Sequence, residues 1–241
     1  MLIAAAVCPH PPLLIPAALG AAAGEPPAPL AAVTDACDRA VRALLAAGPE
    51  LVAVVGGGPA DREYGPGTAG SLADYGVPAV VGEGETALPL SLTVGRWLLS
   101  RAGIGDGQDG PELLFQAVGQ QTAPGDCRKL GIMIADRAAQ VALLAMGDGT
   151  ARRARDVEGA ADPQAQEYDE DVAEALAAAD ARWLARLDPA QDEQLLVAGR
   201  AAWQVLAGAA TGTRLHGRLL CMCCPYGVTY LVATWEQGQA G

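Results

Sequence analysis

The sequence predicts a single α/β domain, spanning residues 1–241, with a mainly parallel central sheet and helices on both faces. Short, continuously apolar runs at residues 2–7, 51–55 and 141–146 are typical of strands that are buried on both faces. Helical spacing of apolar residues follows the first run, and each run ends in a turn rich in Gly, Pro or polar residues. This order describes βαβ units, whose parallel strands place their loops at the same sheet edge.

The first unit is the clearest part of the pattern. The strand at residues 2–7 is followed by His10 in a proline-rich loop and by a helix at residues 30–45, which Gly48 and Pro49 stop. The second strand, at residues 51–55, is followed by a turn of three glycines and Pro59. We therefore expect His10 and the glycine turn to be neighbours.

The middle of the chain is less regular. Residues 61–84 are rich in Gly, Pro and polar side chains, which indicates a long functional or flexible loop with a short strand at residues 77–81. A helix is expected at residues 88–102, a strand at 113–118 and a second helix at 130–138.

The C-terminal third begins with the strand at residues 141–146 and the turn that contains Asp148. Two long helices are expected next, at residues 165–187 and 191–207, the second carrying Leu195, Leu196, Trp203 and Leu206. A hairpin closes the chain, with strands at 219–223 and 228–235.

Composition excludes several classes of partner. The formal net charge is -12 and the isoelectric point is near 4.5, so nucleic acid and anionic membrane surfaces would be repelled. The first residues carry no positively charged segment before their apolar stretch, and the six cysteines are scattered. We expect a cytoplasmic protein with reduced thiols.

Three motifs stand in order along nearly the whole chain. Residues 7–14 read VCPHPPLL, residues 146–152 read MGDGTAR with Tyr168 and Asp169 at the start of a later helix, and residues 225–233 read PYGVTYLVA. They resemble the first-strand motif, the SGDLSHR segment and the closing PYGVGYFVA strand of the catalytic subunit of class III (LigB-type) extradiol ring-cleavage dioxygenases, a family related to the Memo proteins.

The resemblance implies a divalent metal such as Fe(II), held by two histidines and a carboxylate, and a further histidine as acid and base. His10 matches the first metal ligand. The second ligand would fall where this chain has Gly57 and Gly58, and the acid-base histidine aligns with Ala151. The remaining histidine, His216, fits a polar surface turn at residues 213–217.

The candidate pocket consists of His10, Gly57, Gly58, Glu63 and Asp148 at one edge of the sheet. His10 either serves a ligand site or only fixes its loop. The glycines offer backbone N–H groups to an anion, or mark close packing. Glu63 either replaces the missing ligand or is solvated. Asp148 either contacts a substrate or metal, or pairs with a neighbouring arginine at position 152 or 153.

Two functions follow from these residues. The first is a divergent oxidoreductase of the extradiol dioxygenase type that uses His10 and nearby carboxylates with a metal. The second is a pseudoenzyme of the same fold that has lost the metal and binds a small molecule or a partner subunit. The family resemblance implies a homodimer in either case.

Overall fold

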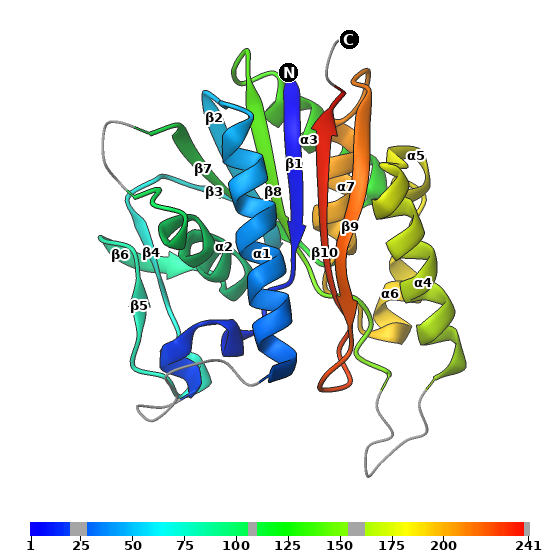
Figure 1. Ribbon diagram of the computed structural model, residues 1–241, viewed down its shortest axis with the longest axis horizontal. Helices are drawn as coiled ribbons and strands as arrows, with labels where there is room; N and C mark the ends of the chain where they lie inside the picture. Colours follow the sequence, from blue (N-terminus) through cyan, green and yellow to red (C-terminus); the bar gives the residue numbers. More distant parts are fainter. Residues whose placement is uncertain (20–27, 106–109, 154–161, 239–241) are drawn as a thin grey trace.

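The computed structural model describes residues 1–19, 28–105, 110–153 and 162–238. Its central sheet has seven strands, flanked by helices (Figure 1). The strands are β1 (Leu2–Cys8), β2 (Leu51–Gly58), β3 (Arg62–Tyr64), β7 (Glu112–Gly119), β8 (Val141–Met146), β9 (Leu215–Cys223) and β10 (Tyr230–Gln237).

The strands lie in the order β3-β7-β2-β8-β1-β10-β9. Strands β7, β2, β8 and β1 form a parallel block, whereas β3 pairs antiparallel with β7, β10 with β1, and β9 with β10. The α/β class is therefore confirmed, but the sheet is mixed rather than mainly parallel. The reason is local, because β9 and β10 are joined by a short turn, which only antiparallel neighbours allow.

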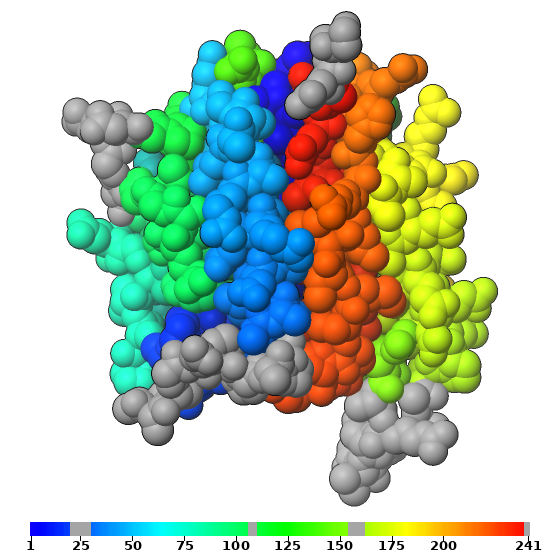
Figure 2. Space-filling model, in the orientation of Figure 1, coloured from blue at the N-terminus to red at the C-terminus, as the bar shows by residue number. Residues whose placement is uncertain are grey.

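Helices cover both faces of the sheet (Figure 1). Alternate residues of β1 face opposite sides, so that Ala4, Ala6 and Cys8 pack under one layer and Leu2, Ala5 and Val7 under the other. Figure 2 shows α1, in blue, lying across the middle of one face with β9, in orange, beside it. That face carries α1 (Ala28–Ala46) and α2 (Leu90–Arg101), and the other carries α3 (Pro124–Ala135), α4 (Pro163–Ala178), α5 (Ala181–Leu184), α6 (Pro189–Leu195) and α7 (Arg200–Ala209).

Much of the stretch expected as a long loop is ordered structure. Besides β3 it holds β4 (Thr68–Ser71) and β5 (Val80–Val81), which form a small sheet with β6 (Glu85–Leu88) in the order β5-β4-β6. The buried guanidinium of Arg96 in α2 donates to the carbonyl oxygen of Pro66 at 2.6 Å and ties this subsheet to the core. The short strand expected at residues 77–81 is present in part as β5, whereas β3 and β4 were not expected, because such short strands leave little periodicity in the sequence.

The two long helices expected after β8 are four shorter ones. Ala179 directly follows α4 and Leu196 directly follows α6, and both residues end their helix with a positive φ, 52° and 55°. New helices start where aspartates cap them: Asp180 accepts from the backbone N–H of Trp183, and Asp188 from that of Ala190. The turn at Leu196 also leaves this side chain 50% exposed, whereas Leu195, Trp203 and Leu206 are buried.

None of the helices in the described part of the chain is long and apolar enough to cross a lipid bilayer.

Candidate functional site

His10 and Asp148 meet where two neighbouring parallel strands end. Cys8, the last residue of β1, pairs with Met146, the last of β8, and the N–H of Gly147 donates to the carbonyl oxygen of Cys8 at 2.9 Å. One residue further, the backbone N–H of His10 donates to Oδ1 of Asp148 at 2.8 Å. The prediction that these two residues share one sheet edge is confirmed.

The two side chains are close but not directly hydrogen-bonded. Nδ1 of His10 lies 3.7 Å from Oδ1 of Asp148, which is too long for a hydrogen bond. The side chains are 12% and 13% exposed, and among the described residues the buried Nδ1 has no hydrogen-bond partner. A buried ring nitrogen without a partner can form a hydrogen bond with a further polar group, and the neighbouring carboxylate can accept another.

Tyr230, at the start of β10, is a third member of this edge that the sequence reasoning missed. Burial raises the pKa of its hydroxyl, and the negative charge of nearby Asp148 raises that pKa further. The phenol therefore stays protonated and able to donate. Its only signal in the sequence was its place within the closing motif.

Asp169 fixes the loop that carries Asp148. Its carboxylate is fully buried and accepts from the N–H of Thr150 at 2.9 Å, the hydroxyl of Thr150 at 2.7 Å and the hydroxyl of Thr229 at 2.5 Å. Burial nevertheless raises the pKa of Asp169 above its usual value. Nη1 of Arg153 lies 3.9 Å from Oδ2 of Asp169. This arginine, one of the two considered as partners of Asp148, therefore forms an ion pair with Asp169 instead.

Gly57 and Gly58 continue strand β2, and the expected glycine turn does not form. Gly57 pairs with Val118 and Gly58 with Gly119, so their backbone belongs to a ladder with β7 rather than to a turn. The pairing of Gly56 with Met146 still places Gly57 next to the turn of Asp148.

Glu63 lies away from this edge. It sits on β3, the outer strand, and its carboxylate forms an ion pair with Arg137 at 2.8 Å. Its expected place beside His10 was wrong, because the chain turns back after β2 and Glu63 pairs with Gln116 of β7. Nearby Asp61 holds the turn after β7 by accepting from the N–H of Gly119 at 2.7 Å.

His216 lies at the opposite end of the sheet. It pairs with Glu236, which pairs with Ala4 near the beginning of β1, whereas His10 follows the end of that strand. It belongs to β9 rather than to a turn, but it is exposed and remote from His10, as expected.

Comparison with known proteins shows a similar fold but identifies no family. The chain is similar to a solved structure of the uncharacterized protein JW3007 from Escherichia coli K12, with 13% identity and a TM-score of 0.54. The match covers 97% of this chain and 99% of that one. No family model and no curated protein matches the sequence. The likeness extends over the whole chain and concerns the fold alone.

The residues at the strand edge do not fit the iron site that the sequence motifs imply. His10 supplies an imidazole and Asp148 a carboxylate, but Gly57, Gly58 and Ala151 have no ligating side chain. Among the described residues, no three His, Cys, Asp or Glu side chains come together in a way that could hold a metal ion. His10 and Asp148 instead supply an imidazole nitrogen and a carboxylate that can each form a hydrogen bond.

A buried ion pair between α6 and α7 was also missed by the sequence reasoning. Asp192 of α6 and Arg200 of α7 are both buried, with Oδ2 and Nε 2.7 Å apart, and Tyr168 donates to Oδ1 of Asp192 at 2.6 Å. Burial raises the pKa of Asp192 to about 6, against the opposing effects of Tyr168 and Arg200. Arg200 also donates to the carbonyl oxygens of Gln120 and Thr122, so the pair ties α6 and α7 to the turn after β7.

Proposed function

We propose that this protein has a class III extradiol dioxygenase-like fold and acts as a ligand-binding pseudoenzyme, with its site at the His10–Asp148 edge. The ligand class we propose is a small hydroxylated aromatic molecule of the catechol type. The observation that carries the proposal is the unpartnered, buried Nδ1 of His10 beside the carboxylate of Asp148.

The chemistry of the pair suits a hydroxyl group. Nδ1 of a neutral imidazole accepts or donates one hydrogen bond, and a carboxylate accepts several. A ligand hydroxyl placed between the two groups would donate to the carboxylate of Asp148 and accept from Nδ1 of His10 in the tautomer that carries a proton there. The protonated phenol of Tyr230, close to Asp148, adds a donor for a second hydroxyl. The place supports the proposal, since ligands of open α/β sheets bind beyond the carboxyl ends of parallel strands.

Binding without ring cleavage is the part of the proposal that rests on the missing side chains. Ring cleavage of this type needs a metal with open coordination positions and a group that moves protons. Glycine stands at the expected second ligand positions and alanine at the expected acid-base position. The remaining residues favour recognition of a diol over its oxidation.

The test is titration of the purified protein with catechol, followed by calorimetry and by amide chemical shifts. His10→Ala and Asp148→Asn should weaken binding by at least about tenfold, the loss expected for one or two buried hydrogen bonds to a ligand. His216→Ala is the matched control, since it removes the other histidine from the opposite end of the sheet. Equal weakening by all three variants, or no binding to the parent protein, would refute the proposal.

A further inference from the structure

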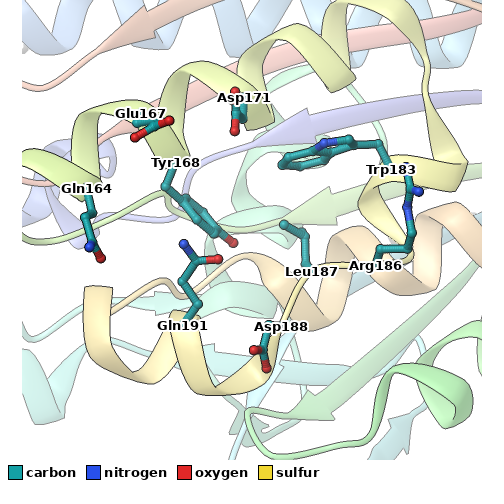
Figure 3. A pocket seen from close by; sticks show the side chains of 9 residues that line it. All are labelled: Gln164, Glu167, Tyr168, Asp171, Trp183, Arg186, Leu187, Asp188 and Gln191. Carbon is teal, nitrogen blue, oxygen red and sulfur yellow. The ribbon is translucent and has the colours of Figure 1, made fainter.

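A hollow lies between α4, α5 and α6, and neither His10 nor Asp148 is among the residues that line it. It has a volume of about 450 Å³, within the range of small-molecule sites. Figure 3 shows the side chains that line it: α4 contributes one wall, the start of α6 another, and Trp183 of α5 closes one end.

The floor of this hollow is formed by an aromatic and an aliphatic side chain. Tyr168 and Leu187 are buried and lie at its centre (Figure 3). The hydroxyl of Tyr168 is fixed by its 2.6 Å hydrogen bond to Asp192, which is itself held by Arg200. An aromatic ring anchored from below gives a ligand a preformed surface that needs little reordering on binding.

The walls carry an excess of negative charge. Glu167 and Asp171 stand four residues apart on one face of α4, and Asp188 precedes α6. Among the lining residues that the structure describes, Arg186 is the one positive side chain, so their net charge is -2. The half-buried indole of Trp183 adds an electron-rich ring, which attracts cations.

From this combination we infer that the hollow binds a small organic cation, a primary amine with an apolar body. The apolar body packs on Tyr168 and Leu187, beside the indole of Trp183. The ammonium group lies toward the α4 wall, where Glu167 and Asp171 offset its charge. The inference uses none of the residues of the strand-edge site, so either proposal can fail without the other.

The probe is 2-phenylethylamine, which is protonated at pH 7 as a lysine side chain is. Its matched neutral analogue is 2-phenylethanol, which has the same ring and chain. Calorimetry should give at least about tenfold tighter binding of the amine, because only the amine gains the charge interactions of the walls. Amide shifts should move in α4, α5 and the start of α6.

Variants locate the charge. Glu167→Gln and Asp171→Asn should each weaken amine binding by about threefold, as expected for single exposed ion pairs, and together by about tenfold. Glu170→Gln is the control, because it removes the same charge from the same helix at a residue outside the lining. Circular dichroism and melting temperature should show that all of these surface variants fold.

Trp183→Leu tests the aromatic wall, since leucine keeps an apolar contact and removes the ring. This variant should weaken the binding of 2-phenylethylamine more than the binding of 2-phenylethanol. Equal binding of amine and alcohol, a loss in Glu170→Gln as large as in the double variant, or no binding of the amine would each overturn the inference.

Discussion

Nε of Arg200 and Oδ2 of Asp192 lie 2.7 Å apart, and both side chains are almost fully buried. Arg200 further contacts Gln120, Thr122 and Gln204, so the guanidinium connects α7 to the turn after β7. A buried ion pair of this kind is most sensitive to the loss of one partner.

Replacing Arg200 by Met should therefore lower the free energy of unfolding by about 3–5 kcal/mol, because Asp192 is left as a buried, uncompensated carboxylate. Chemical denaturation at pH 7 measures this. Arg186→Met is the control, since that arginine is exposed, and it should change stability by less than about 0.5 kcal/mol. Equal effects of the two variants would contradict the prediction.

The same pair predicts a dependence of stability on pH. The pKa of Asp192 is raised to about 6 in the folded protein, whereas an unfolded aspartate titrates near pH ~3.9. Between these values the folded state binds more protons, so this group's contribution to the unfolding free energy decreases as the pH rises from about 4 to about 6. The Asp192→Asn variant should lack this pH-dependent contribution. Denaturation curves of the parent protein and the variant at several pH values measure the difference in unfolding free energy. Parallel pH profiles would show that Asp192 does not titrate in this window.

At the strand edge, Asp148→Asn should change the unfolding free energy by less than about 1 kcal/mol, because the amide oxygen of asparagine still accepts from the N–H of His10. Asp148→Ala should cost about 1–3 kcal/mol, since that N–H loses its partner. Thermal melts of both variants, with and without catechol, separate the structural role of Asp148 from ligand binding. A stabilising effect of catechol that persists in Asp148→Asn would place the ligand elsewhere.

The glycines of β2 differ in the space around them. An added Cβ at Gly56 would lie 2.5 Å from Oγ of Ser91, whereas at Gly57 the nearest heavy atom is the carbonyl oxygen of Ala198, 3.8 Å away. Gly56→Ala should therefore destabilise the protein by about 1–3 kcal/mol through overpacking, and Gly57→Ala by less than about 1 kcal/mol. Urea denaturation of the two variants decides the matter, and a reversal of the order would contradict it.

The purified protein supplied with ferrous iron should not cleave catechol or protocatechuate, because Gly57, Gly58 and Ala151 stand where the resemblance to extradiol dioxygenases would place the second iron ligand and the acid-base histidine. The check is the absorbance of the yellow ring-fission product under air. Formation of that product, abolished by His10→Ala, would contradict the prediction.

The sequence by itself determined the parallel block of strands and the meeting of His10 with Asp148. Residues 2–7, 51–55 and 141–146 are apolar throughout, a pattern that fits strands covered on both faces. Once such strands are parallel, the residues that follow them must share one edge. This part of the candidate site required no knowledge of side-chain packing.

Only the tertiary structure showed where Glu63 lies in the sheet and which residues contact Arg200. The short strand that carries Glu63 pairs with a strand almost fifty residues later, and three residues give too little periodicity to predict that pairing. Helices end at Ala179 and Leu196 in a left-handed conformation that side chains disfavour, so local preferences do not reveal these ends. Arg200 and Asp192 lie on separate helices, and the chain changes direction after Leu196, between α6 and α7. The contact between these two buried charges therefore depends on how the helices pack.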